Sequence, residues 1–233
     1  IVKGEKTAKM LHNEMKQYIL ETGGGEAFYT KSNNRGANIS YTWYLNKWRK
    51  KMVKAIGIDP GTKSIDMFGF DDKTEKILID KIIPRDDFTK NPQIILDILR
   101  NLTNSIGKIY VIVGPSGYGI TPKRATETED SEILMATFVS ESDAKRRLKI
   151  IGLRELMFFM KKASDLNIWF TPGVIHLPTV PRFRKAGKID MGTADKLFSV
   201  ILAMKDQAES LNLDYSETSF ILIEIGFAYT SAM

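Results

Sequence analysis

Three short apolar strands separated by tight turns, beginning at Met52, constrain the fold of this chain more than any other feature. Val53–Ile58 is largely apolar and is followed by the turn formers Asp59-Pro60-Gly61-Thr62. Ser64–Phe70 reads as a second strand, and Lys76–Ile83 alternates as a third until Pro84 stops it. Strand-like runs this close together predict an antiparallel three-stranded meander.

The rest of the chain alternates helical and strand-like patterns. An apolar stripe at helical spacing predicts a helix over Asn91–Ser105, with Pro92 in its first turn and Gly107 after its end. The later predicted elements are a strand at Ile109–Val113, helices at Glu129–Val139 and Ser142–Ala163, a strand at Ile168–Leu177, a helix at Thr193–Leu211 and a strand at Ser219–Ile225. The order β-β-β-α-β-α-β-α is that of the ribonuclease-H-like α/β fold, a mixed sheet with flanking helices.

The composition excludes several kinds of site. The chain has no cysteine, which removes disulfides, thiolate zinc sites and cysteine nucleophiles and favours a reducing, cytoplasmic location. Two histidines, His12 and His176, are too few to build a histidine metal centre, so any metal is expected to be Mg2+ held by oxygen ligands. Membrane association is not expected, because even the apolar run Phe220–Ile225 is interrupted by Glu224.

The excess positive charge lies in the N-terminal fifth of the chain. Residues 1–51 hold ten Lys/Arg and four Asp/Glu, whereas residues 52–233 hold twenty-four of each. Four aromatic residues in the first segment alternate with bases, a pattern that can bind nucleic acid: Tyr41, Trp43, Tyr44 and Trp48. We favour the alternative that residues 1–51 are an N-terminal extension, because every recognisable motif follows Met52. Nucleic acid is therefore not the expected partner of residues 52–233.

The first motif that carries chemistry is Gly57-Ile58-Asp59-Pro60-Gly61-Thr62-Lys63. A buried strand that ends in an acid, followed by a glycine turn, can hold a hydrated Mg2+ through Asp59. The backbone amides of the Gly61–Lys63 turn can then approach phosphates. The alternative is an ordinary hairpin turn with a solvated aspartate, since the same residues are good turn formers.

This motif resembles the first phosphate motif of the ASKHA superfamily, which contains acetate and sugar kinases, Hsp70 chaperones and actin. The stretches Val111–Gly119, His176–Pro181 and Lys188–Lys196 are similar to an archaeal family of unknown function described as predicted butyrate-kinase-like. The resemblance covers residues 52–233. It implies an actin-like ATPase lobe, with ATP and Mg2+ as cofactors and Gly57, Asp59, Gly61, Thr62 and Lys63 as nucleotide-binding residues.

A second glycine-rich loop, Gly114-Pro115-Ser116-Gly117-Tyr118-Gly119, follows the predicted strand Ile109–Val113. Open α/β sheets bind ligands at the carboxyl ends of their strands, so Gly114, Ser116 and Gly117 are expected to bind a substrate carboxylate or phosphate. The alternative is a flexible turn without a ligand. The loop is not a P-loop, because it lacks the Gly-Lys-Ser/Thr sequence.

A basic segment between Pro178 and Lys188 supplies two candidate catalytic residues, Arg182 and Arg184. Their guanidinium groups suit the phosphoryl oxygens of a transferring group. A solvated basic loop explains the same residues equally well. His176 lies in an apolar segment and is expected to pack rather than act as a base.

Two further candidate groups follow. Asp190 precedes the predicted helix Thr193–Leu211 and is a candidate metal ligand or base by resemblance, although Asp190 or Thr193 could equally cap that helix. In the segment from Ile223 to Thr230, Gly226 and Thr230 occupy the second phosphate motif of the ASKHA proteins, with Glu224 replacing their usual aspartate. A glutamate inside such an apolar strand requires a charged partner.

These residues predict ATP-dependent phosphoryl transfer, with a short-chain carboxylate such as butyrate or acetate as the acceptor that the resemblance implies. A resolvase-like nuclease is the first alternative, since its first strand also reads Gly-Ile-Asp-Pro-Gly. Such a nuclease needs three or four converging carboxylates, the second of them at the end of the fourth strand. This chain has Val113-Gly114-Pro115 at that position, which counts against a nuclease. A non-catalytic, nucleotide-binding actin-like module is the second alternative.

The predicted organisation has three parts: an extension at residues 1–51, a first lobe with its connecting helix at residues 52–215, and the start of a truncated second lobe at residues 216–233. Because an ASKHA enzyme closes two lobes over ATP, we expect the chain by itself to bind ATP weakly and to be catalytically inert. The expected partners are a nucleotide and a small acid, and the sequence leaves a homodimer open.

Overall fold

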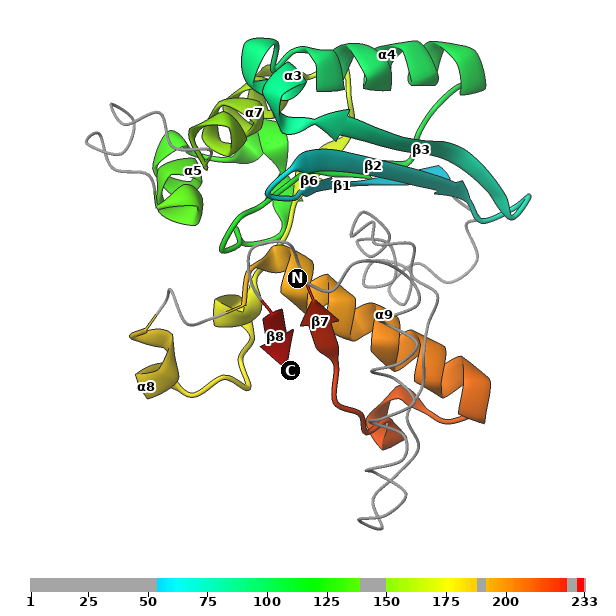
Figure 1. The fold of residues 1–233 in the computed structure, drawn as a ribbon, viewed down its shortest axis with the longest axis vertical. Helices are drawn as coiled ribbons and strands as arrows, with labels where there is room; N and C mark the ends of the chain where they lie inside the picture. Colours follow the sequence, from blue (N-terminus) through cyan, green and yellow to red (C-terminus); the bar gives the residue numbers. More distant parts are fainter. Residues whose placement is uncertain (1–53, 139–149, 188–191, 226–229, 233) are drawn as a thin grey trace. The chain divides into compact units, whose positions relative to one another are not determined.

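A mixed six-stranded sheet organises the structure, a computed structural model that describes residues 54–138, 150–187, 192–225 and 230–232 (Figure 1). These residues belong to a unit that spans residues 35–233. The strand order is β3-β2-β1-β4-β6-β5. The strands are β1 Lys54–Pro60, β2 Ser64–Asp71, β3 Lys76–Pro84, β4 Val111–Val113, β5 Lys123–Arg124 and β6 Ile168–Phe170.

The direction of the strands brings four carboxyl ends, those of β1, β3, β4 and β6, to one edge of the sheet. β1, β2 and β3 form the predicted antiparallel meander. β4 pairs parallel with β1, and β6 pairs parallel with β4, whereas the short β5 runs antiparallel to β6. The segments that follow β1, β4 and β6 therefore leave the sheet at the same edge, where open α/β sheets place their ligands.

The predicted helices are present with shifted ends. α4 begins at Ile94, after Pro92, and ends at Ile106. The other helices are α3 Arg85–Lys90, α5 Asp130–Thr137, α7 Ile150–Lys162, α8 Arg182–Lys185 and α9 Ala194–Leu211. Residues 139–149, which contain parts of two predicted helices, lie outside the described ranges. In the described ranges, no helix is both long and apolar enough to cross a bilayer.

The strand predicted over Ile168–Leu177 is too long. β6 ends at Phe170, and a short 3-10 turn occupies Val174–His176. The backbone at Gly173 lies so close to the loop after β4 that an added Cβ would come within 2.3 Å of the Tyr118 carbonyl oxygen. The chain turns away here to make a contact between two loops, which the apolar pattern of the segment does not indicate.

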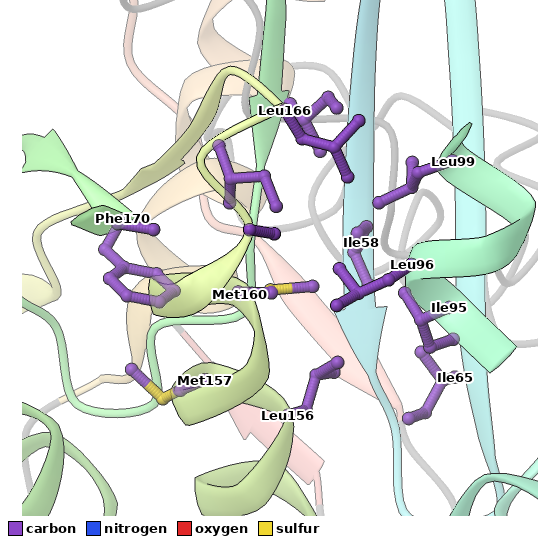
Figure 2. Packing of buried hydrophobic residues seen from close by; sticks show 14 of the residues in the cluster. Ile58, Ile65, Ile95, Leu96, Leu99, Leu156, Met157, Met160, Leu166 and Phe170 are labelled. Atoms are coloured by element: carbon purple, nitrogen blue, oxygen red, sulfur yellow. The ribbon is translucent and has the colours of Figure 1, made fainter. Parts of the chain in front are cut away.

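One face of the sheet carries the main core. Ile56 and Ile58 of β1 and Ile65 and Met67 of β2 alternate toward this face and belong to one apolar cluster with residues of α4 and α7. Figure 2 shows Ile58 and Ile65 of this cluster together with its members from the two helices. Helix α4 contributes Ile95, Leu96 and Leu99, and α7 contributes Leu156, Met157 and Met160. Because strand side chains alternate between faces, the intervening residues of β1, including Asp59, lie on the opposite face.

The opposite face carries a smaller apolar cluster of Ala55, Val111 and Val113, flanked by Tyr110 and Trp169. Asp59 follows this cluster at the carboxyl end of β1. A separate two-stranded sheet pairs β7, Ile223–Ile225, antiparallel with β8, Thr230–Ala232. β7 is shorter than the strand predicted over Ser219–Ile225, since residues 219–222 are not in the ladder.

Candidate functional site

Asp59 stands at the carboxyl end of β1, one residue before the strand ends at Pro60. In the antiparallel pair of β1 and β2 it lies directly opposite Asp66, which is buried. The Ser64 hydroxyl donates a 2.7 Å hydrogen bond to Asp66 Oδ1. Like charges directly opposite each other destabilise a strand pair, so this arrangement favours a cation or a proton between them.

Arg85 holds the turn after Asp59 through two hydrogen bonds, a role that no sequence motif indicated. The Arg85 amide donates a 2.9 Å hydrogen bond to the Lys63 carbonyl, and Arg85 Nη1 donates to the Gly61 carbonyl at 3.3 Å. Burial lowers the pKa of Arg85, whose guanidinium also lies 5.8 Å from the Phe88 ring centroid. These contacts fix Gly61 and Lys63 by their carbonyl groups, while Thr62 is exposed.

The amino end of α9 is fixed to the ends of β4 and β6. The Ala194 amide donates a 2.9 Å hydrogen bond to the Gly117 carbonyl, and the Val174 amide donates to the Gly192 carbonyl at 3.1 Å. Thr193, one of the two residues that could cap α9, is its N-cap residue, although its side chain makes no capping hydrogen bond. The loops after two parallel strands therefore determine where the first turn of α9 lies.

The first turn of α9 brings a partly buried group of ion pairs close to Asp59. Lys196 is 14% exposed, and its ammonium lies 2.9 Å from Asp195 Oδ2. The same ammonium forms an ion pair with Glu224 Oε1 of β7. The partner required by Glu224 in its apolar strand is thus Lys196. Burial lowers the pKa of Lys196, but the two carboxylates outweigh that effect and raise it overall.

The surroundings of Asp59 raise its pKa from 3.8 to about 7. Burial is the largest cause, followed by the negative charges of Asp195 and Asp66, with Glu224 adding a smaller effect in the same direction. Lys196 is the only cation named among the described residues whose charge opposes this shift. The ionised site is therefore short of positive charge, and a divalent cation would stabilise it.

This raised pKa predicts that stability falls as pH rises. The folded chain keeps the Asp59 proton up to about pH 7, whereas the unfolded chain releases it near pH 3.8. The contribution of this proton to the free energy of unfolding is therefore largest at low pH. It is lost as the pH rises from 3.8 to about 7, and the loss amounts to about 2 kcal/mol once solvent screening is considered. We expect Asp59→Asn to remove this slope and to be more stable than the natural chain at pH 8.

Denaturant unfolding of both chains at several pH values measures the effect. Asp86→Asn is the matched control, because Asp86 is an exposed carboxylate in the first turn of α3. That variant should follow the natural chain at every pH. If Asp59→Asn were less stable than the natural chain at pH 8, the carboxylate would be satisfied in the folded state and the predicted slope would be wrong.

The predicted substrate loop has a structural role that its sequence did not indicate. Ser116 is buried, and its hydroxyl donates to the Gly114 carbonyl at 3.1 Å and accepts a 2.9 Å hydrogen bond from the Thr171 amide. A Cβ at Gly114 would lie 3.0 Å from Met160 Sδ, and one at Gly117, where φ is +53°, would lie 2.3 Å from the Ala136 carbonyl oxygen. These contacts hold the loop, and substrate binding by it stays a prediction.

The two arginines are not brought to Asp59 by any described contact. Arg182 and Arg184 are exposed on α8, and Arg184 lies 5.8 Å from the ring centroid of Phe183, which is itself exposed. His176 is exposed, so the expectation that it packs in an apolar strand is wrong; its Nδ1 accepts a 3.3 Å hydrogen bond from the Gly173 amide. Asp190 and Gly226 lie outside the described residues, and of Thr230 only the backbone, in β8, is described.

The described residues contain no group of three His, Cys, Asp or Glu side chains arranged to hold a metal ion. A site that binds Mg2+ here would therefore use few protein ligands, with water and ligand phosphates completing the coordination. Asp59 and Asp195 are the carboxylates best suited to bind the metal, since each lies in the charge group around Lys196. This charge group consists of Asp59, Asp66, Asp195, Lys196 and Glu224. The sequence motifs located Asp59, but they gave no function to Lys196.

A family model for proteins of unknown function (DUF1464) matches residues 57–233. The chain belongs to the DUF1464 family. The match includes Asp59, the first turn of α9 and Glu224, so the charge group lies wholly within the DUF1464 region. A search of curated proteins gives no match to this chain.

Proposed function

We propose that this DUF1464 protein is an ATP-dependent phosphotransferase with an actin-like, ribonuclease-H-type first lobe. The strand order β3-β2-β1-β4-β6, with β1 antiparallel to β2 and parallel to β4, supports that fold. The motif that resembles the first phosphate motif of the ASKHA proteins lies at the carboxyl end of β1.

The observation that carries the proposal is the position of Asp59. Its carboxylate stands at a strand end, next to a glycine turn, in surroundings that hold too little positive charge. Asp59, with Asp195 beside Lys196, would hold Mg2+, directly or through water. When bound, Mg2+ would neutralise charge on the β- and γ-phosphates of ATP. The residues of the Gly61–Lys63 turn would contact the phosphates.

The acceptor that the resemblance favours is a short-chain carboxylate. A carboxylate oxygen would attack the γ-phosphorus, the bond from that phosphorus to the β,γ-bridging oxygen would break, and ADP would leave with the electron pair. The product is an acyl phosphate. Because the acceptor is already ionised at neutral pH, no protein group needs to remove a proton from it.

The nuclease alternative has less support. Two-metal cleavage needs three or four carboxylates that converge on the metal ions. In the described ranges no three metal-ligating side chains are arranged in this way. The residue that follows β4, where a nuclease would need its second carboxylate, is Gly114. It has no side chain that could bind a metal, and an added Cβ would lie only 3.0 Å from Met160 Sδ.

An acceptor screen on the full-length protein tests the proposal. The protein is incubated with Mg·ATP, acetate, propionate or butyrate, and hydroxylamine, which traps acyl phosphates as hydroxamates. We expect hydroxamate and ADP in equal amounts with at least one acid. If the protein binds ATP but forms neither hydroxamate nor ADP, it is a non-catalytic nucleotide-binding module and not an enzyme. Failure to bind ATP would overturn the proposal.

A further inference from the structure

The environment of Lys196 distinguishes it from the other charged residues of α9. Lys205 of the same helix pairs with Glu209 one turn away, and both side chains are well exposed. Lys196 instead is largely buried and contacts Asp195 on its own helix and Glu224 on β7. Its pairing therefore links two segments that are 28 positions apart in the sequence.

The backbone around Lys196 is built to allow this path. A Cβ at Gly192 would lie 3.1 Å from Lys196 Cβ and 2.8 Å from a methyl group of Val174. The glycine therefore leaves the room through which the lysine stem passes. The Gly-Thr-Ala-Asp-Lys sequence at residues 192–196 consequently serves to place an ammonium group, in addition to starting a helix.

The Glu224 carboxylate is only half satisfied by this ion pair. Its Oε1 atom pairs with Lys196, while its Oε2 atom is buried and has no hydrogen-bond partner among the residues that the structure describes. A buried carboxylate oxygen without a partner is costly, so the ion pair does not hold Glu224 in its best environment. An arrangement of this kind can be exchanged for another when a ligand supplies new charges.

A bound magnesium–phosphate group would supply such charges. Asp59 and Asp195 would turn to the metal, and the phosphate oxygens would offer the lysine more negative charge than Glu224 does. We propose that Lys196 is the residue that binds the phosphate group at this site, and that its pair with Glu224 is the ligand-free resting arrangement. This inference rests on the proposed function, and it gives Lys196 the role that the sequence assigned to Arg182 and Arg184.

A double-mutant cycle separates this role from a structural ion pair. Lys196→Met, Glu224→Gln and the double variant are made in the full-length protein, and binding of Mg·ATP and of Mg·tripolyphosphate is measured by calorimetry. We expect Lys196→Met to weaken binding of both probes about tenfold or more, because a charge-assisted phosphate contact is lost. Glu224→Gln should tighten binding about threefold, because the lysine is then released.

The decisive quantity is the effect of Glu224→Gln when Lys196 is absent. In the Lys196→Met background it should fall below about twofold, because the gain depends on the lysine. Lys205→Met and Glu209→Gln, which break the exposed pair of α9, should leave binding unchanged. Thermal unfolding checks that each variant is folded, and Lys196→Gln replaces the methionine variant if that one is not.

The other results overturn the inference, the proposed function on which it rests, or both. Equal weakening by Lys196→Met and Glu224→Gln would make the pair structural. Strictly additive effects would make them long-range charge effects without a lysine–phosphate contact. If tripolyphosphate binds with the expected coupling and ATP does not, Lys196 keeps its role and the nucleotide function fails. If ATP binds without coupling, the function survives and the role of Lys196 fails. If the natural protein binds neither probe, both fail.

Discussion

Replacing Asp59 by asparagine is expected to weaken the binding of Mg·ATP to the full-length protein about 100-fold. The two side chains have almost the same size, but asparagine offers Mg2+ no negative charge. Loss of one charged ligand in a partly buried site corresponds to about 2–3 kcal/mol. The same change removes the repulsion from Asp66 and Asp195, so binding and stability should move in opposite directions.

Calorimetric titration above pH 8 measures this effect, because the Asp59 carboxyl is ionised there in the natural protein. Asp86→Asn, which removes an exposed charge from α3, is the control and should bind as the natural protein does. A variant that is more stable but binds Mg·ATP undiminished would place the nucleotide elsewhere. Asp59 would then be a buried acid without a ligand.

The second large effect is expected at Gly119, where alanine should destabilise the fold by about 3 kcal/mol or more. The glycine has φ of +103°, and an added Cβ would lie 1.9 Å from the Gly173 amide nitrogen. Gly119 lies in the loop after β4 and Gly173 in the loop after β6, and these two loops position the start of α9. The backbone of one loop must therefore move away from the other, which also displaces Gly117 and its hydrogen bond to Ala194.

Gly107→Ala provides a matched control for this prediction. Gly107 also has positive φ, +77°, but nothing lies within 4 Å of its added Cβ. It should cost only the conformational strain, about 1 kcal/mol. Denaturant unfolding measures both variants. Equal costs would mean that the loops separate without penalty and that their contact does not hold the edge of the sheet.

Local pattern was sufficient to predict the half of the fold that is made of neighbouring elements. The meander of β1, β2 and β3 follows from apolar runs separated by turn formers, and the acid at Asp59 marks where β1 stops. The helix predicted after the meander is present as α4, with Leu96 added to its buried stripe. In each case the pairing partners are close in sequence, so one segment carries the information.

The parts that could not be predicted depend on contacts between distant segments. The pattern at Ile168–Leu177 is apolar throughout, and only the approach of Tyr118 to Gly173 shows why β6 stops at Phe170. Glu224 indicated that a cation was needed, but no local pattern distinguished Lys196 from the other lysines and arginines of the chain. The burial of Arg85 could not be predicted either, because it depends on contacts with residues that are distant in the sequence.

The contact between the loops after β4 and β6 also fixes the position of the amino end of α9. The first turn of this helix is tied to Gly117 and follows the bond between Gly192 and Val174. With 18 residues, α9 is a lever roughly 27 Å long. A tilt of about 10° at the anchored end would carry Leu211 by roughly 5 Å. A rearrangement of charge beside Asp59 that tilted α9 about this end would therefore move Leu211 further than it moved Lys196.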